Sequence, residues 1–571
     1  MRTTTLLVAA LLAGNALALG TGTAPKPGDR IDDFMLLDHG GQAHKLYYLS
    51  DATAVVLMAH SATCPGFADY ESRFETAADA YRDRGVVFLM VNSESAAHAT
   101  LRHEVQSETP ILIDQAGLVG DALGLTHAGE LLVIDPERWQ LRHRGVASGD
   151  VGQVIDAVLN GGEVTSTEVP ARACALTYAP APRTVSYAAD IAPMLIDNCV
   201  TCHREGGIGP WAMTGYNMVR GFAPMIREVV RTKRMPPWHA DPIHGTFTND
   251  RSLSTDEVRK LVHWVETGAP RGDGPDPLAT LDAEWPDWGL GEPDLIVDIP
   301  AFDVPATGVV EYQYQRVVNP LDRDVWVRAT EILPGDRAAL HHVIATFRHP
   351  KPDGTGFGQR GGGLGGYVPG AEPRGAPENT GTFLPAGALL VFQMHYTPYG
   401  KAVTDHSKFG LYFHDTPPRH RLANAVLMNT RIRIPPNTKW HSEFAEQTFD
   451  RDVLLYSLLP HAHYRGTASE FRAFYPDGRE ELLLSVPNYD FNWQTTYVLE
   501  EPKVLPAGTR VVHTTWWDNS AQNPANPDPN REVPWGRQSW DEMLFGSLRL
   551  RYLDDEIAQA TSAVEESGAS D

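Results

Sequence analysis

The stretch Ala54-Val55-Val56-Leu57-Met58 decides the fold of the first part of the chain, together with a second apolar run, Val86-Val87-Phe88-Leu89-Met90-Val91. Short apolar runs of this kind are typical of buried strands. Between them, apolar residues recur at intervals of three and four, as on one face of a helix. These helix residues are Phe67, Tyr70, Phe74, Ala77 and Tyr81. Further apolar runs follow at 111–113 and 131–134, so residues 25–160 are predicted to form an α/β domain.

Length and composition limit the function classes. The chain has 571 residues, which corresponds to roughly four domains. Its net charge of −24 disfavours a sequence-independent grip on a phosphate backbone, so nucleic acid is not an expected partner. Only 4 Cys rule out a disulfide-stapled scaffold, whereas 22 His justify a search for metal sites.

The N-terminus carries the pattern of a secretory signal. Arg2 precedes an apolar run at 6–12, and Ala16-Leu17-Ala18 is a small-x-small cleavage pattern, so residues 1–18 are predicted to be a signal peptide. The alternative is an uncleaved helix that anchors the protein to the membrane. No other window reaches about 18 apolar residues, so we expect a periplasmic mature chain without a membrane span.

Changes of composition and of hydrophobic periodicity along the chain mark the remaining domain boundaries. Residues 161–186 are rich in Gly, Pro, Thr and Ala and are predicted to be a linker. Residues 187–275 show helical patterns and are predicted to form an all-α domain. From residue 292, short β-rich runs broken by turn residues predict two all-β antiparallel sandwiches, at 292–420 and 421–555. Residues 556–571 are predicted to form a disordered tail.

Two local signals in these regions are sharper. Ser254 and Glu257 have the spacing of a capping box, which predicts the start of a helix that ends before Gly268 and Pro270. The glycine-rich segment 360–366 has no flanking strand and helix of a nucleotide-binding unit, so it is predicted to be a flexible loop between sandwich strands.

A haem-attachment motif stands in the helical region. Cys199-Val200-Thr201-Cys202-His203 is C-x-x-C-H, in which two thiols form thioethers to haem and the adjacent His is the proximal iron ligand. The alternatives are a redox C-x-x-C or half of a zinc site, but the chain has no second cysteine pair to complete a zinc site. We therefore expect one covalent haem c in a cytochrome c-like domain.

Met235 is the expected sixth ligand of this haem. It lies in the stiff stretch Arg234-Met235-Pro236-Pro237-Trp238, and a thioether ligand raises the reduction potential of the iron. The competing ligands are Met213, Met218, Met225 and His239. A six-coordinate iron favours electron transfer over oxygen binding.

Five histidines of the β-rich half form compact groups: His341-His342, His395 and His461-Ala462-His463. Two histidines at i and i+2 on a strand share one face, as a single metal requires. Adjacent His341 and His342 would point to opposite faces, so joint ligation requires a bulge. Imidazoles alone suit zinc as well as copper, whereas a thioether partner favours copper.

The order of these groups resembles a known family. His-His, then Met394-His395-Tyr396, then His-x-His, then Asp541-Glu542-Met543 is similar to the type II copper, ascorbate-dependent monooxygenases, which include the peptidylglycine hydroxylating and dopamine β-monooxygenases. The resemblance covers residues 292–555 and implies two jelly-roll-like sandwiches that hold two copper ions.

The same resemblance implies a role for each group. By it, His341, His342 and His395 would hold the electron-accepting copper. His461, His463 and Met543 would hold the catalytic copper, where dioxygen binds and a substrate C–H bond is hydroxylated. Two positions depart from the family: Leu459 and Ser547 replace the Arg and Tyr that clamp a substrate carboxylate in peptide-amidating members. This difference argues against a peptidylglycine substrate.

Residues 25–160 resemble the thioredoxin-like, peroxiredoxin-type fold, with Cys64-Pro65 after the first buried strand. The peroxidatic pattern P-x-x-x-T/S-x-x-C has Leu57 in place of Pro, although Ser61 fits, and Phe67 fills the second Cys position of a C-x-x-C. Cys174 is the remaining thiol that could pair with Cys64. Three interpretations stay open: a thiol peroxidase, a redox relay through a Cys64–Cys174 disulfide, and an inert docking domain in which the two cysteines staple the linker.

Together these signals predict a periplasmic copper- and dioxygen-dependent monooxygenase that acts on a small organic substrate. Its electrons would come through the haem from an ascorbate-like reductant or another cytochrome. The alternative function is a copper- and haem-containing redox sensor or electron-transfer protein without an organic substrate.

Overall fold

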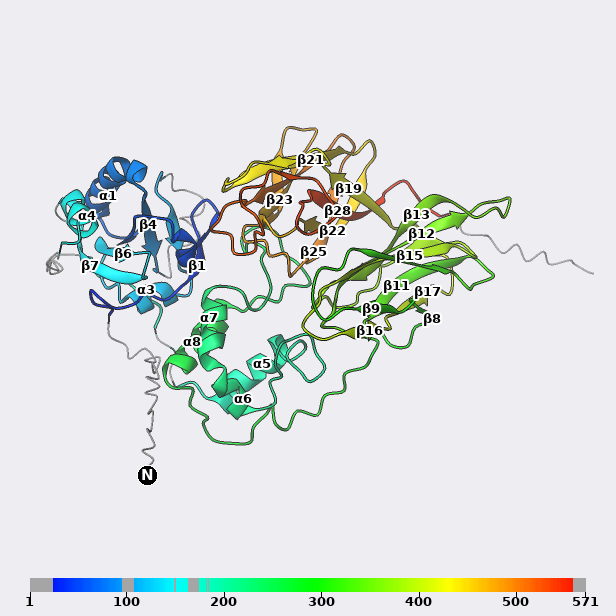
Figure 1. The fold of residues 1–571 in the computed structure, drawn as a ribbon, viewed down its shortest axis with the longest axis horizontal. Helices are drawn as coiled ribbons and strands as arrows, with labels where there is room; N and C mark the ends of the chain where they lie inside the picture. Colours follow the sequence, from blue (N-terminus) through cyan, green and yellow to red (C-terminus); the bar gives the residue numbers. More distant parts are fainter. Residues whose placement is uncertain are drawn as a thin grey trace, which may run out of the picture.

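A computed structural model of the chain describes residues 24–94, 107–147, 150–162, 174–180, 182 and 184–557. The expected signal peptide lies outside these residues, as do half of the expected linker (163–173, 181 and 183) and nearly all of the expected tail. Figure 1 shows four parts: an α/β domain, a small group of helices and two β-rich regions. Within the described part of the chain, no helix has the length and apolar character needed to cross a membrane.

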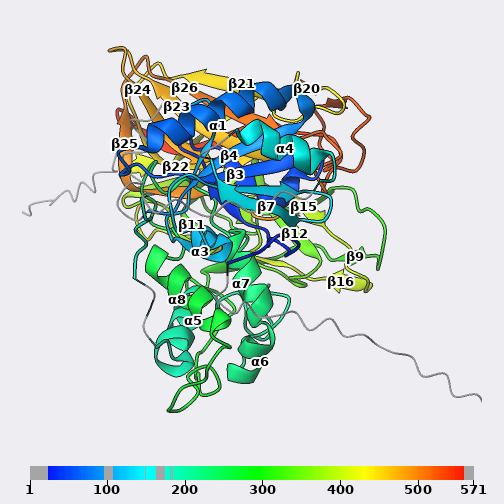
Figure 2. The same cartoon turned by 90° about the vertical axis from the view of Figure 1, so that its left-hand side faces the viewer.

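The N-terminal domain is a five-stranded sheet in the order β5-β4-β3-β6-β7, with helices on both faces. Val56 and Met58 of β3 pack against α1 and α4 on one face, and Val55 and Leu57 pack against α3 on the other. Figure 2 looks onto the face covered by α1 and α4. The strands are β1 (Met35–Leu37), β2 (Ala43–Lys45), β3 (Ala54–Ala59), β4 (Val86–Asn92), β5 (Ile111–Ile113), β6 (Glu130–Asp135) and β7 (Gln140–Val146). The helices are η1 (Leu46–Leu49), α1 (Phe67–Tyr81), η2 (Arg82–Arg84), α3 (Leu118–Leu123) and α4 (Val151–Leu159). The predicted strands and the predicted helix are thereby confirmed.

A disulfide joins Cys64, just before α1, to Cys174 in the expected linker. The backbone around Cys174 also pairs with this domain, because the Ala128 amide donates to the Cys174 carbonyl at 2.9 Å. At its far end, the same segment accepts a hydrogen bond at 3.0 Å from Arg259 to the Ala179 carbonyl. Residues 174–180 of the expected linker are therefore attached at one end to the α/β domain and at the other end to the helical region.

The middle region consists of short helices joined by long loops. Its helices are η3 (Tyr187–Ile191), α5 (Ala192–Asn198), α6 (Tyr216–Gly221), α7 (Ala223–Arg231) and α8 (Thr255–Glu266). The predicted capping box at Ser254 and Glu257 begins α8. The region is less helical than predicted, because residues 199–215 and 232–254 run as loops rich in Gly and Pro. Tyr187 and Trp264 lie at the centre of its core.

One of these loops anchors the helices to the β-rich half. The Thr248 amide donates to the Val498 carbonyl and the Glu500 amide donates to the Thr246 carbonyl, both at 2.9 Å, so the loop adds to the edge of β25. Trp238 packs against Tyr497 in the core of the second β-rich region. The helical region is therefore fixed to this sheet by backbone hydrogen bonds and by apolar packing.

The first β-rich region has two main sheets, in the orders β10-β15-β12-β13 and β18-β14-β11-β17-β8, around one core. Its strands are β8 (Leu295–Asp298), β9 (Phe302–Val304), β10 (Gln313–Val318), β11 (Val325–Leu333), β12 (Leu340–Pro350), β13 (Phe357–Tyr367), β14 (Thr380–Leu384), β15 (Leu389–Tyr396), β16 (Val403–Asp405), β17 (Lys408–Phe413) and β18 (His420–Arg421). The glycine-rich segment 360–366 lies within β13, so the prediction of a flexible loop is wrong. Glycine is needed there because a Cβ on Gly361 would come within 2.0 Å of the Phe347 ring.

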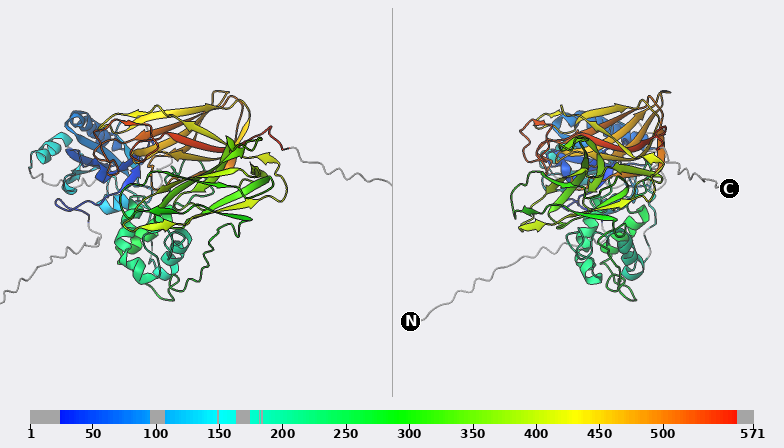
Figure 3. Two further views of the ribbon diagram at one scale, coloured as in Figure 1. Left: turned by 45° about the vertical axis from the view of Figure 1, so that its right-hand side comes forward. Right: turned by 90° about the vertical axis from the view of Figure 1, so that its right-hand side faces the viewer.

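The second β-rich region repeats this plan with sheets β19-β28-β22-β25 and β21-β26-β23-β24. Its strands are β19 (Ala423–Met428), β20 (Arg433–Ile434), β21 (His441–Thr448), β22 (Val453–His461), β23 (Gly466–Phe474), β24 (Glu480–Val486), β25 (Tyr497–Leu505), β26 (Arg510–Trp517), β27 (Val533–Pro534) and β28 (Phe545–Tyr552). Figure 3 shows the two β-rich regions side by side, with the helices packed below them. The chain therefore follows its α/β domain with a mostly β C-terminal half.

The disulfide yields a stability prediction. Replacement of Cys64 by Ser is expected to destabilise the α/β domain by about 2–5 kcal/mol, because the bridge closes a long loop in the unfolded chain. Amide hydrogen exchange of peptides from β3 and β6 in the full chain would measure this loss. Because the two cysteines are partners, the double variant C64S/C174S should be no less stable than either single variant. Additive losses in the double variant would contradict the pairing.

Candidate metal centres

Three of the predicted ligands come together on two paired strands. β12 carries His341 and His342, and β15 carries His395. His342 lies directly opposite His395, and the register shifts between Leu340 and His342. This irregularity is the bulge that joint ligation by two adjacent histidines requires. The structure thus brings all three imidazoles to one place.

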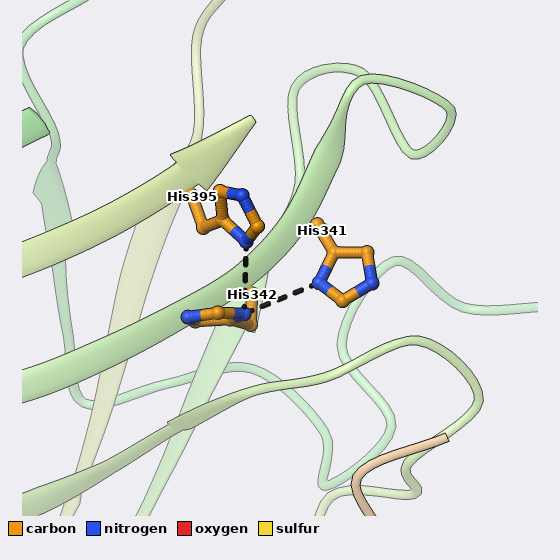
Figure 4. A group of neighbouring side chains, drawn as sticks. All are labelled: His341, His342 and His395. Carbon is orange, nitrogen blue, oxygen red and sulfur yellow. Dashed lines mark hydrogen bonds between the residues drawn. The ribbon is translucent and has the colours of Figure 1, made fainter. Parts of the chain in front are cut away.

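The Nδ1 atoms of the three rings converge (Figure 4). The Nδ1 of His342 lies 3.2 Å from that of His341 and 3.4 Å from that of His395. A neutral imidazole carries a single N–H, so three converging ring nitrogens are better satisfied by one cation than by one another. Burial lowers the pKa of His341 to about 4 and that of His395 to about 3, so both rings are neutral at pH 7 and can offer lone pairs. This donor set fits a copper or zinc ion.

His461 and His463 form a second pair, at the end of β22. The Nδ1 of His461 lies 2.9 Å from the side-chain oxygen of Gln494, and the Nδ1 of His463 lies 3.2 Å from the Asp541 carbonyl. Both oxygens can only accept, so each Nδ1 carries the proton and each Nε2 keeps its lone pair. The Nε2 of His463 is buried and has no hydrogen-bond partner in the described structure. An orphaned ring nitrogen of this kind fits a metal ligand.

Met543 is held beside this pair through its backbone. The Met543 amide and the His463 amide donate to the same oxygen of Glu542, at 3.3 and 2.8 Å. Two residues later, Phe545 lies opposite His461 across β28 and β22. Met543 thus belongs to the segment that leads into the strand paired with His461, and a set of two imidazoles and a thioether would fit copper better than zinc.

Phe491 stands between the two sets. Its ring stacks on His341 at a centroid distance of 5.0 Å and meets His463 edge-on at 6.0 Å. It also lies 6.5 Å from His395, and only 8% of its surface is exposed. The two sets therefore face each other across one buried aromatic ring.

Leu459 and Ser547, the positions that depart from the family, are neighbours in the structure. They lie directly opposite each other on β22 and β28, and each is half-buried. Neither side chain carries a charge. Together they offer no ionic partner to a substrate carboxylate.

The C-x-x-C-H motif follows α5. Burial raises the pKa of Cys199 to about 12 and also raises that of Cys202, so neither thiol has the low pKa of a redox dithiol. The Nδ1 of His203 lies 3.1 Å from the Trp211 carbonyl, which leaves the lone pair on Nε2. Two neutral, unpaired thiols beside an imidazole with a free Nε2 fit covalent haem.

The candidate sixth ligands differ in their positions. Met235 follows α7 and is half-buried, and its amide donates a hydrogen bond to the Val229 carbonyl at 3.2 Å. Met213 is buried, and its amide donates to the His203 carbonyl at 2.8 Å. Met218 and Met225 are 42% and 50% exposed, which makes them poor candidates. His239 is buried near the second β-rich region, and its burial lowers its pKa to about 4.

Three residues at these centres were missed by sequence reasoning. Phe491 and Gln494 belong to a loop without a motif, so only the packing of the two β-rich regions identifies them. Glu542 lies within the segment Asp541-Glu542-Met543, but nothing in the sequence assigns a role to its carboxylate.

Comparison with known proteins identifies the N-terminal part. Residues 27–144 match the AhpC/TSA family. Three solved structures resemble this part: a hypothetical protein from Sinorhizobium meliloti (25% identity, 28% of this chain and 97% of that chain, TM-score 0.24), peroxidoxin BcpB from Mycobacterium tuberculosis (21%, 24% and 95%, 0.21) and the thioredoxin domain of a thiol-disulfide oxidoreductase from Bacteroides vulgatus (14%, 24% and 100%, 0.22). No curated protein matches the chain significantly.

The expectation of a thioredoxin-like, peroxiredoxin-type domain is confirmed by the family match. Both cysteines of this domain are in the disulfide, so the described structure has no free thiol at the peroxidatic position. The match ends at residue 144. The assignments of copper and haem therefore rest on the geometry of the helical and β-rich regions.

The first histidine set yields a direct test. Replacement of His342 by Ala removes the central ring of three, so the copper content of fully loaded protein should fall from about two ions per chain to about one. Elemental analysis after removal of loosely bound metal would measure the change. His349 on the same strand packs against Phe347 and belongs to neither set, so H349A should keep both ions. Equal copper in H342A and wild type would contradict the assignment.

Proposed function

We propose that the protein is a periplasmic copper- and dioxygen-dependent monooxygenase that hydroxylates a small organic substrate, with electrons delivered through a covalently bound haem c. One observation carries this proposal: two sets of neutral, buried donors with different chemistry face each other across Phe491. A buried imidazole whose ring nitrogen has no partner is unfavourable unless that nitrogen binds something. The three converging Nδ1 atoms of the first set and the unpaired Nε2 of His463 in the second are better explained by two metal sites than by core packing.

The two sets would have different roles, electron acceptance in the first and substrate hydroxylation in the second. Copper bound in them would supply one-electron chemistry between Cu(I) and Cu(II). The three imidazoles of His341, His342 and His395 suit both oxidation states, whereas the Met543 thioether favours Cu(I) beside His461 and His463. The Gln494 and Asp541 oxygens keep the protons of His461 and His463 on Nδ1, which would leave the lone pairs of both Nε2 atoms available to a metal ion.

The surroundings of the second set favour an uncharged substrate. Leu459 and Ser547 provide no cation to bind a carboxylate, and Phe491 adds an apolar wall that excludes water. Desolvating a charged group there without a partner would be costly. We therefore propose an apolar or weakly polar substrate in place of a peptide carboxylate.

The helical region would act as a cytochrome c-like electron donor. Cys199 and Cys202 would hold the haem through thioethers and His203 would bind its iron through Nε2, with Met235 as the proposed sixth ligand and buried Met213 as its competitor. The position of the motif supports this role. Burial is the main cause of the raised pKa of Cys202, and the charges of Arg251, which lowers it, and of Glu372, which raises it, also act on this thiol; Glu372 belongs to the first β-rich region. Arg251 also bonds the Gly370 carbonyl at 2.8 Å, so the motif lies against the region that carries the first histidine set.

The thioredoxin-like domain supports a general oxidoreductase function. Its Cys64–Cys174 disulfide favours two of the three interpretations over a thiol peroxidase: a redox relay, and a docking domain in which the disulfide attaches the linker. Peroxide consumption and turnover that are both unchanged in C64S would favour the staple.

The metal and haem contents of matured protein test the proposal first. About two coppers and one haem per chain would support the monooxygenase. One haem with zinc, or with no tightly bound copper, would favour the alternative of a redox-sensing or electron-transfer protein without an organic substrate. Ferrous haem that dioxygen reoxidises at the same rate with and without bound copper would contradict the electron relay.

Replacement of Met543 by Leu tests the second set. The variant keeps the side-chain volume but removes the sulfur, so hydroxylation should fall at least about a hundredfold, while the haem spectrum stays unchanged. Dioxygen-dependent product formation in a substrate screen and the visible absorption spectrum give the two readings. Met428, an exposed methionine of the same region, provides the matched control M428L. Retained hydroxylation in M543L would refute the ligand assignment.

A further inference from the structure

The carboxylate of Glu542 lies beside the second histidine set, where it accepts a hydrogen bond from the His463 amide, and the proposed function gives it no role. Glu542 has no exposed surface. Its Oε2 accepts hydrogen bonds from the His463 amide at 2.8 Å, the Trp517 indole at 3.0 Å and the Met543 amide at 3.3 Å. Its Oε1 accepts from the Arg465 amide at 2.6 Å. Four donors from three segments thus converge on one buried side chain.

A carboxylate at this depth is costly unless its oxygens are paired. Core packing alone would be served as well by an apolar residue of similar size. The four hydrogen bonds offset the cost, and each also fixes one donor in place. The buried position of Glu542 is therefore explained by the four N–H donors that its oxygens fix in place.

Oε2 is the link between the two halves of the second set. It binds the backbone of His463, in the turn after β22, and the backbone of Met543, which is 80 residues later in the sequence. Arg465 braces the same turn, because its guanidinium donates to the Asn519 side chain at 2.8 Å and to the Trp540 carbonyl at 3.0 Å. Those bonds hold the turn as a whole, but Oε2 contacts the amides of both proposed ligands.

We propose that Glu542 is a positioning residue for the second metal set: its carboxylate holds His463 and Met543 at the spacing that one ion requires. This inference rests on the proposed function, because it takes these residues as ligands. A thioether is a weak ligand, so the free energy of its bond to the ion would offset little of the cost of moving the side chain into place. Its contribution therefore depends on how well the protein positions it beforehand.

Glutamine cannot reproduce this arrangement. Its side chain has one acceptor oxygen, and its NH2 group would face at least one of the four N–H donors. An amide oxygen turned toward His463 and Met543 puts the NH2 against the Arg465 amide, and the opposite rotamer puts it against the three donors at Oε2. Glu542→Gln therefore changes the hydrogen bonds while it keeps the shape of the side chain.

The test compares Glu542→Gln with a matched control, Glu331→Gln, in the full chain loaded with Cu(I). Glu331 is likewise a buried glutamate; it lies in the first β-rich region and accepts from the Gly289 amide at 2.8 Å and the Tyr412 hydroxyl at 3.0 Å. The readings are Cu(I) affinity by competition with a chelator and the copper–sulfur scattering in X-ray absorption. In E542Q, we expect at least about tenfold weaker binding of one of the two ions and loss of the sulfur scattering, as for other residues that support metal ligands. E331Q should lose stability but keep both readings.

Trp517→Phe gives a second variant, because it removes a single donor from Oε2 and leaves the carboxylate. W517F should weaken the binding of the same ion by a smaller factor than E542Q does. If E542Q does not fold, W517F alone tests the inference. Wild-type affinity and sulfur scattering in E542Q, or wild-type affinity in W517F where E542Q is unfolded, would overturn the inference. A wild-type protein that shows no sulfur scattering with bound Cu(I) would instead overturn the proposed function itself, so the two failures are distinguishable.

Discussion

Strand register is the constraint on which the rest of this structure depends. The proposed metal ligands come from strands distant in the sequence, and antiparallel pairing brings them together: His342 opposite His395 in one region, and His461 opposite Phe545, close to Met543, in the other. A slip of one residue would turn every side chain of a strand to the other face and separate the ligands. Well-packed cores fix the register in both regions, which allows polar imidazoles to converge in a buried place.

The other parts of the chain are attached close to these centres. The loop at 246–250 extends β25 by hydrogen bonds, which ties the C-x-x-C-H region to the second β-rich region, while Arg251 reaches the first. The thioredoxin-like domain contacts the second region through a 2.6 Å hydrogen bond from the Tyr48 hydroxyl to Asp518. An electron-donating domain has to lie close to its acceptor. The fusion would provide this proximity without a diffusional encounter.

The N-terminal domain matches the AhpC/TSA family over residues 27–144, but its Cys64 is not a free thiol in the structure. Cys64 stands just before α1, as a reactive cysteine of this fold would, yet it is bonded to Cys174 of the linker. The segment around Cys174 is held by the α/β domain at one end and by Arg259 of α8 at the other. The disulfide therefore acts at the connection between two parts of the molecule, where it restrains the linker whether or not it also transfers electrons.

The sequence by itself determined the local features of this protein. Apolar runs and helical spacing are properties of neighbouring residues, so they predicted the strands and the helix of the first domain, and the capping box predicted the start of α8. The sequence also predicted which histidines would form the two groups, and it predicted that joint ligation by His341 and His342 requires a bulge. Only the tertiary structure decided what depends on contacts between distant segments. It supplied the bulge, placed Phe491 between the two sets and put one oxygen of Glu542 against two proposed ligands. It also made a strand of the glycine-rich segment, because this segment pairs with β12 at a place where the Phe347 ring leaves no room for a Cβ on Gly361.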